Sequence, residues 1–147
     1  MFNSAELLAR VKTHVEIEEM ILLLNIIWFI FGGGFISWFL WVLLGCLLFL
    51  TVAGIPFAYA AFRIAGFAAF PFGRILVDSR DLGEKRVVGT GLANFLWIVL
   101  AGIWLAISHI VAGATLCLSI IGIPFGFAHF RLAMVCFAPL GKKPVAI

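Results

Sequence analysis

The chain has 147 residues, of which 65% are hydrophobic and 12% are charged, and its formal net charge is +3. Its mean hydropathy is +1.22. A soluble domain of this length has an apolar share nearer one half, so the composition argues against one and predicts that lipid covers much of the chain.

The first nineteen residues carry both acidic and basic side chains and differ from the segment that follows. Apolar side chains recur there at helical spacing after a candidate cap at Asn3 or Ser4, which predicts an amphipathic helix over 1–19. Two interpretations of this helix stay open: it lies on the membrane surface, or its apolar stripe makes a soluble oligomer contact. The mixed charge argues against a secretory signal peptide.

Two long apolar stretches follow, at about 20–72 and about 87–140. Each is about 50 residues long, whereas one helix needs ~20 residues to cross a bilayer, so each stretch predicts two spans. The expected spans are 20–40, 42–62, 88–107 and 110–130. Membrane repeat 1 then covers 20–77, a cytoplasmic loop covers 78–87, and membrane repeat 2 covers 88–147.

An internal repeat connects the two stretches. Residues 45–77 align with 113–145 at a constant offset of 68 without a gap, and 14 of these 33 positions are identical. Upstream, one asparagine and one tryptophan of each half match at offset 69, as Asn25 with Asn94 and Trp28 with Trp97. The repeat therefore predicts one helical hairpin present twice. The expected fold is an all-α integral membrane protein with two tandem parallel repeats, about four transmembrane spans and the N-terminal amphipathic helix.

Aromatic and basic side chains set the expected orientation. Trp38, Trp41, Trp104 and His109 are expected at the far interface of the two hairpins, because interfacial aromatics prefer that position. The bases flank the spans on the other side and are Arg10, Lys12, Arg74, Arg80, Lys85, Arg86, Lys142 and Lys143. The positive-inside rule then predicts that both termini and the central loop are cytoplasmic.

The sequence Gly-Ile-Pro occurs once in each half and is expected to break the second span of each hairpin. Proline removes a backbone hydrogen bond from a helix, and the preceding glycine loosens the helix further. Either the break gates or lines a pore, or it is a fixed bend. The candidate pore or gating residues are Gly54, Pro56, Arg63, Gly122, Pro124 and Arg131.

Arg63 and Arg131 follow these prolines at the same spacing. They are expected either to reach lipid phosphates or, in an oligomer, to form a basic ring that favours anions. Gly45 and Gly113 recur at one depth and are expected to allow close helix packing.

The sequence does not support a proton relay, a cation or metal site, or enzymatic catalysis. No acidic residue lies within an expected span, so a carboxylate proton relay or cation site is not expected. His109 and His129 have no further ligand at metal-binding spacing, and no metal or cofactor is expected. No nucleophile with a base, paired carboxylates or phosphate loop is found, so the chain is expected not to be an enzyme.

The second half carries a family resemblance. It includes His109-Ile110-Val111-Ala112-Gly113, the run 117–124 ending in Gly-Ile-Pro, Phe130-Arg131, and Pro139-Leu140-Gly141-Lys142-Lys143. In these segments the chain resembles the YccF family of bacterial inner-membrane proteins, whose short membrane domain usually occurs as a tandem pair. The resemblance covers about 22–145 and implies a bacterial inner-membrane location. It brings no established activity, and residues 1–19 extend beyond it.

Two functions remain in view. The first is a homo-oligomeric ion channel or pore, anion-favouring if selective, because four short spans cannot enclose a hydrated path alone. The alternative is a membrane scaffold or accessory subunit that binds a partner or anionic lipid without transport activity. A solute transporter ranks third. The expected partners are membrane lipids, further copies of the chain and ions, with no nucleic acid.

Overall fold

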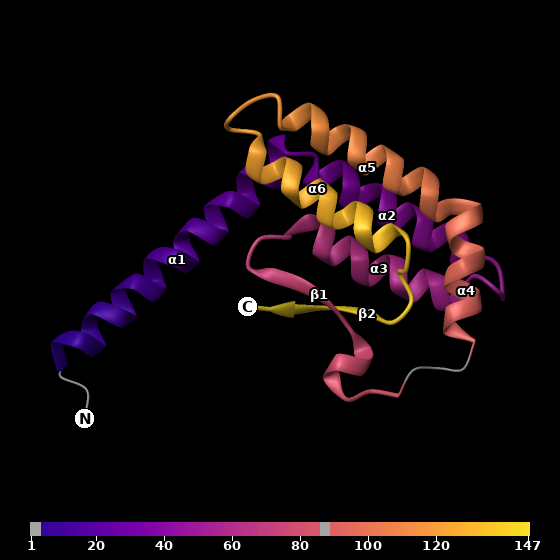
Figure 1. Cartoon of the computed structure of the whole chain (residues 1–147), viewed down its shortest axis with the longest axis horizontal. Helices are drawn as coiled ribbons and strands as arrows, with labels where there is room; N and C mark the ends of the chain where they lie inside the picture. The colour runs from indigo at the N-terminus through magenta and orange to yellow at the C-terminus, as the bar shows by residue number, and fades with distance from the viewer. Residues whose placement is uncertain (1–3, 86–88) are drawn as a thin grey trace.

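The structure is a computed structural model that describes residues 4–85 and 89–147. Most of these residues are helical, and the helices are joined by short turns (Figure 1). In chain order the elements are α1 (Ser4–Phe31), α2 (Gly34–Phe49), α3 (Ile55–Ala69), β1 (Arg74–Asp78), the 3-10 helix η1 (Ser79–Leu82), α4 (Thr90–Trp97), the π-helical turn η2 (Ile98–Gly102), α5 (Ile103–Leu116), α6 (Ile123–Cys136) and β2 (Lys142–Ala146).

Two helical hairpins, α2–α3 and α5–α6, form the body of the molecule, and a tight turn closes each of them. The hydroxyl oxygen of Thr51 accepts a hydrogen bond from the Gly54 amide at 3.1 Å, and Ser119 does the same for Gly122 at 3.0 Å. A Cβ atom on Gly54 would lie 2.3 Å from the Leu48 carbonyl oxygen, and one on Gly122 would lie 2.1 Å from the corresponding oxygen of Leu116. Only glycine fits this turn.

The turn position corrects two predictions. The Gly-Ile-Pro sequences do not interrupt helices but begin them: Pro56 and Pro124 occupy the first turns of α3 and α6. Proline is tolerated there because the first amides of a helix have no intrahelical partner. The expected hairpin turns near residues 41 and 109 are also wrong, since both positions lie within helices, α2 and α5.

Two of the four residues expected at the interface, Trp41 and His109, are instead buried, whereas Trp104 is exposed. Trp41 is 2% exposed, and its histidine counterpart, His109, is 9% exposed. Their amphipathic chemistry suits an interface, but helix packing buries them here, because the turns lie farther along the chain than span length alone predicted.

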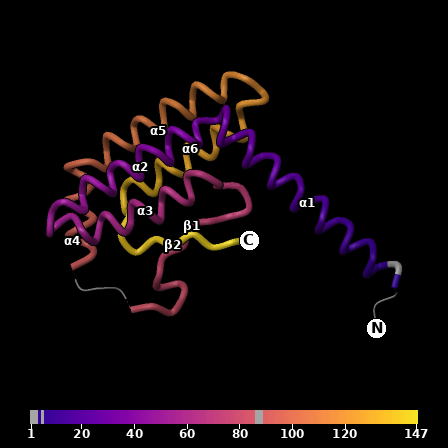
Figure 2. Tube along the Cα trace, turned by 180° about the vertical axis from the view of Figure 1, so that it is seen from behind, coloured from indigo at the N-terminus to yellow at the C-terminus, as the bar shows by residue number. Residues whose placement is uncertain are grey.

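The hairpins are layered over a short β-ribbon. Figures 1 and 2 show α5 above α6 and α2 above α3, with the strands β1 and β2 on the side opposite α5. More than half of α3 is buried, mainly alanines that allow close approach. By contrast, α2 and α5 expose large apolar side chains such as Phe39, Leu43, Trp104 and Val111. The outer helices therefore present a surface suited to lipid.

The ribbon, which the expected all-α class lacked, relates the two halves. The strands pair antiparallel, and Leu76 lies opposite Pro144. These two residues are 68 positions apart and are therefore equivalent in the repeat. Pairing of a segment with its own equivalent in antiparallel register is the pattern of an approximate two-fold axis through the ribbon.

The two-fold relation conflicts with the expected pair of parallel spanning hairpins. In Figure 1, α2 and α5 run in opposite directions, whereas two hairpins that enter a bilayer from one side would run in the same direction. Within the described residues, one continuous helix, Thr90–Leu116, is long and apolar enough to cross a membrane. The segments Glu6–Phe31 and Gly34–Phe49 pass the same test only together, with a bend of 71° between them.

The matched asparagines and tryptophans hold each half together. The Asn25 side chain exchanges two hydrogen bonds with the Phe72 backbone, at 3.1 and 3.0 Å, and Asn94 does so with Leu140, at 3.2 and 3.1 Å. The indole N–H of Trp28 donates to the Ala68 carbonyl at 2.7 Å, and that of Trp97 donates to the corresponding carbonyl at 2.8 Å. These bonds satisfy backbone groups where α3 and α6 end.

α1 extends well beyond the body of the molecule (Figures 1 and 2). It is one helix from Ser4 to Phe31 and has no boundary near residue 19, where the sequence predicted the end of a separate helix. Only its last turns pack on the hairpins, through Asn25 and Trp28. Its first part is an exposed arm.

Candidate functional site

A cavity of about 520 Å³ opens where four parts of the chain meet on the ribbon side of the molecule. α3 contributes Pro56, Tyr59 and Arg63, and the segment that follows β1 contributes Ser79, Glu84 and Lys85. The start of α4 and the turn into β2 complete the wall, with Gly89, Thr90, Ala93, Leu140, Gly141 and Lys143. The ribbon thus brings both halves of the chain to one site.

The cavity wall is cationic. Three bases, Arg63, Lys85 and Lys143, and one acid, Glu84, line it. Lys143 forms an ion pair with Glu84. Within the described part of the chain, Arg63 and Lys85 have no hydrogen bond or ion pair. Two positive charges therefore remain without a carboxylate partner.

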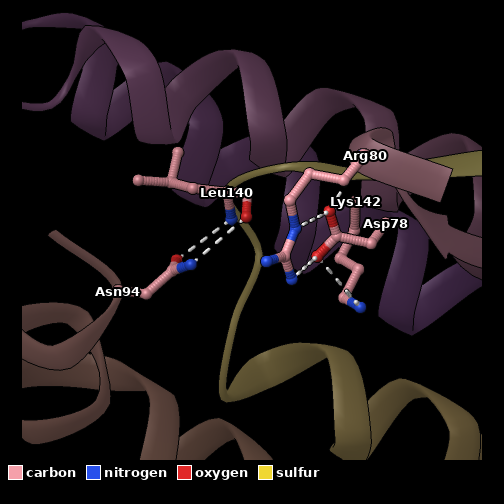
Figure 3. Close-up of polar contacts among 5 residues, drawn as sticks. All are labelled: Asp78, Arg80, Asn94, Leu140 and Lys142. Atoms are coloured by element: carbon pink, nitrogen blue, oxygen red, sulfur yellow. Dashed lines mark hydrogen bonds and ion pairs between the residues drawn. The ribbon is translucent and has the colours of Figure 1, made fainter. Parts of the chain in front are cut away.

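The acid of the ribbon, Asp78, is already paired with two bases (Figure 3). One carboxylate oxygen of Asp78 accepts hydrogen bonds from the backbone and the Nε of Arg80, at 3.1 and 3.0 Å, and Lys142 lies 3.9 Å from the other oxygen. The hydrogen bond from the Arg80 side chain, followed by that from its backbone, lowers the pKa of Asp78 to about 2. Asp78 is thus committed to Arg80 and Lys142.

A backbone feature adds to the positive character of the cavity. Gly89 precedes α4 in a left-handed conformation, with φ of 91°, and provides no side-chain cap. Gly89 and Thr90 both line the cavity. Because the first amides of a helix have no intrahelical partner, this helix start favours an anion nearby.

An exposed apolar turn belongs to the same hairpin as the cationic wall. Tyr59 lines the cavity and packs edge-on against Phe49, with ring centroids 5.9 Å apart. Beyond Phe49, at the tip of the hairpin, Leu50 and Val52 are 84% and 88% exposed. The site therefore suits a ligand that combines an anionic group with an apolar part.

The two arginines matched by the repeat have different surroundings. Arg131 donates to the backbone carbonyls of Pro71, at 3.2 Å, and of Arg74, and its guanidinium lies 5.1 Å from the centre of the Phe67 ring. Arg63 makes none of the corresponding contacts. Arg131 thus ties α6 to the segment that leads into β1, whereas Arg63 is free to bind a ligand.

The remaining candidate residues of the repeat lie in the hairpins. Pro56 joins Arg63 at the cavity, whereas Gly54 and Gly122 close the hairpin turns and Pro124 lies in the first turn of α6. Gly45 and Gly113 lie where a Cβ atom would be 2.7 Å from the Phe62 and Phe130 rings, respectively, so each allows its two helices to pack closely.

Sequence reasoning missed several residues of the cavity. Ser79, Glu84 and Lys143 lie far from Arg63 in the chain, and only the ribbon brings them together. The cluster of bases in 74–86 indicated that this segment contributes positive charge to a site, but it did not indicate which helix the segment would contact.

An apolar outer layer of helices, one described helix long enough to span a bilayer and a basic opposite face are typical of a helical membrane protein. Comparison with known proteins agrees with this class. The family model of the YccF inner membrane component domain matches residues 23–74 and again 92–142. The chain belongs to this family and contains two copies of its domain.

Two curated relatives have the same degree of similarity. The inner membrane protein YccF of Escherichia coli K12 and that of Shigella flexneri are each 31% identical over 131 residues, which cover 84% of this chain and 86% of the relative. No solved structure matches. The relatives support an inner-membrane location.

Proposed function

We propose that this protein binds the phosphate of anionic lipid headgroups in its cationic cavity and acts as a membrane scaffold or accessory subunit, without transport or enzymatic activity. The observation that carries this proposal is the pair of unpartnered bases, Arg63 and Lys85, beside the exposed apolar turn of the first hairpin. A phosphodiester with acyl chains matches both features.

The proposal also includes the arrangement at the membrane. The outer helices α2 and α5 face the acyl chains, and the ribbon and cavity lie at the cytoplasmic headgroups, where anionic lipids attract bases. The termini and the 78–87 segment are then cytoplasmic. Membrane lipids are the main partners, and nucleic acid is not a partner.

The predicted homo-oligomeric ion channel, anion-favouring if selective, is the second candidate. One observation favours it: in an oligomer, the free Arg63 of each copy adds a base to a common mouth. The hydrogen bonds of Arg131 within its own chain count against a ring that contains both arginines.

Lipid retention tests the first candidate. The full chain, purified in mild detergent, is incubated with phosphatidylglycerol or phosphatidylcholine and analysed by native mass spectrometry. We expect phosphatidylglycerol to be retained preferentially. Each base near anionic lipid contributes about 1 kcal/mol, so the double variant Arg63→Gln/Lys85→Gln should bind roughly 30-fold more weakly.

A matched variant controls for net charge. Arg10→Gln/Lys12→Gln removes the same charge from the exposed arm of α1, far from the cavity, and should retain phosphatidylglycerol like the wild type. Equal losses of phosphatidylglycerol binding in both double variants would show that only the net charge matters and would refute the site. Planar-bilayer recording separates the second candidate: reproducible anion currents that Arg63→Gln abolishes would favour the channel.

A further inference from the structure

A second cavity, of about 230 Å³, lies between the two hairpins. Helices α2, α5 and α6 line it, and five of its ten lining residues are aliphatic, including Ile36, Leu40 and Leu105. Ile36 and Leu40 are more than half exposed, so the cavity opens to the surface. Five of its residues carry polar side-chain atoms. Ser108 is exposed, and its hydroxyl donates to the Trp104 carbonyl, whereas the other four are each at least nine-tenths buried: Ser37, Trp41, His109 and His129.

The two histidines form a hydrogen-bonded chain whose direction can be assigned. His129 Nε2 lies 3.2 Å from the Gly32 carbonyl oxygen, which can only accept, so this nitrogen carries a proton and donates. In the neutral ring, His129 Nδ1 then accepts from His109 Nδ1, 3.0 Å away. This leaves His109 Nε2 as an acceptor.

Three further buried polar groups at the cavity have no hydrogen-bond partner among the described residues. These groups are His109 Nε2, the Trp41 indole N–H and the Ser37 hydroxyl. All three residues are buried: His109 is 9% exposed, Trp41 is 2% exposed and Ser37 is 5% exposed. Buried polar groups in native proteins are nearly always hydrogen-bonded. One acceptor and two donors therefore remain for a ligand.

The repeat explains why donor and acceptor both occur here. Trp41 and His109 are equivalent at offset 68, and both line the cavity, which therefore lies between the two halves. The first half supplies an indole donor, and the second supplies an imidazole acceptor. The partner of His109, His129, corresponds to Ala61 in the first half, so the histidine pair exists only once.

We propose that this cavity binds a small, mainly apolar molecule with one hydroxyl group, of the phenol or alcohol class. Its O–H donates to His109 Nε2, and its oxygen accepts from the Trp41 N–H. A hydroxyl is the simplest group that both donates and accepts. Water does so too, but the space is far larger than one water needs, and the aliphatic walls give further waters few of the two to four partners that each requires.

Phenol and toluene form a matched pair of probes, because they share a ring and differ in the hydroxyl. Thermal unfolding of the full chain in detergent measures binding, since a ligand that binds only the folded state raises the midpoint with concentration. We expect saturable stabilisation by phenol and at least tenfold weaker binding of toluene, the equivalent of one hydrogen bond.

Two substitutions on one helix separate the site from general effects. Trp41→Phe keeps an aromatic ring but removes the donor, and should weaken phenol binding about tenfold while toluene binding changes less than twofold. Trp38→Phe makes the same change at a residue that does not line the cavity, and should leave phenol binding unchanged. Equal effects of the two substitutions, or equal binding of the two probes, would overturn the proposal.

Photolabelling of the wild type decides the question even if a variant fails to fold. Irradiation with 4-azidophenol should label peptides from α2 and α5 around Trp41 and His109, and excess phenol should compete with the label whereas toluene should not. Labelling spread over the lipid-facing surface, without competition by phenol, would leave the cavity with water only and contradict the inference.

Discussion

The turn between α5 and α6 gives a prediction whose size can be worked out from the structure. An alanine Cβ at Gly122 would lie 2.1 Å from the Leu116 carbonyl oxygen, far closer than such atoms approach in proteins. The obstacle is backbone within a closed turn, so it cannot move aside as a side chain would. Overpacking of this kind costs about 1–3 kcal/mol, and we expect Gly122→Ala to lie at the upper end.

Gly66→Ala is the matched control. Gly66 lies on the exposed face of α3, and a Cβ atom there would meet nothing within 4 Å. Alanine in an open helical position stabilises by up to about 1 kcal/mol through helix propensity. The same chemical change should therefore have opposite signs at the two glycines.

Thermal unfolding in detergent, followed by circular dichroism, measures the difference. At about 2–4 °C per kcal/mol for a chain of this size, Gly122→Ala should lower the midpoint by roughly 5–10 °C, and Gly66→Ala should raise it or leave it unchanged. A midpoint for Gly122→Ala equal to that of Gly66→Ala would refute the turn geometry.

Three further predictions follow from single contacts. Trp97→Phe removes the donor to the buried Cys136 carbonyl and should cost about 1–3 kcal/mol in chemical denaturation, so a loss near zero would contradict that bond. Arg131→Gln should lower the unfolding midpoint whereas Arg63→Gln should not, because only Arg131 donates to carbonyls of its own chain; equal midpoints would contradict this difference. The pKa of Asp78 is lowered to about 2 from 3.8, so its ionised form contributes stability that is fully present above pH 3.8 and is lost as the pH falls through about 2. The stability difference between wild type and Asp78→Asn should therefore shrink over that range, and a difference independent of pH would argue against the ion pair.

The internal repeat predicted more of the fold correctly than the apolar spans did. Asn25 and Trp28 and their equivalents stood out in the sequence, and the structure gives both pairs the same hydrogen bonds. Hydropathy, by contrast, placed the turns wrongly. Hydropathy places a turn where enough apolar residues have passed to cross a bilayer. In the first hairpin the turn instead forms where the Gly54 amide donates to the hydroxyl of Thr51 and glycine fits the tight backbone.

The long-range features could not be read from one sequence. The strands β1 and β2 are 68 residues apart, each is five residues long, and one contains a proline, so neither carries a clear strand pattern. His109 and His129 lie 20 residues apart, a spacing without meaning until the α5–α6 hairpin closes. Arg63 and Arg131 looked alike because the motif around them is alike, but their neighbours differ.

We propose that the cavity at Arg63 and Lys85 holds the phosphate of an anionic lipid. An experimental structure of the full chain in nanodiscs that contain phosphatidylglycerol tests it most directly. We expect phosphate density within hydrogen-bond distance of the Arg63 guanidinium, with the acyl chains running toward Leu50 and Val52. A cavity empty of lipid, with ordered headgroups bound elsewhere on the protein, would contradict it.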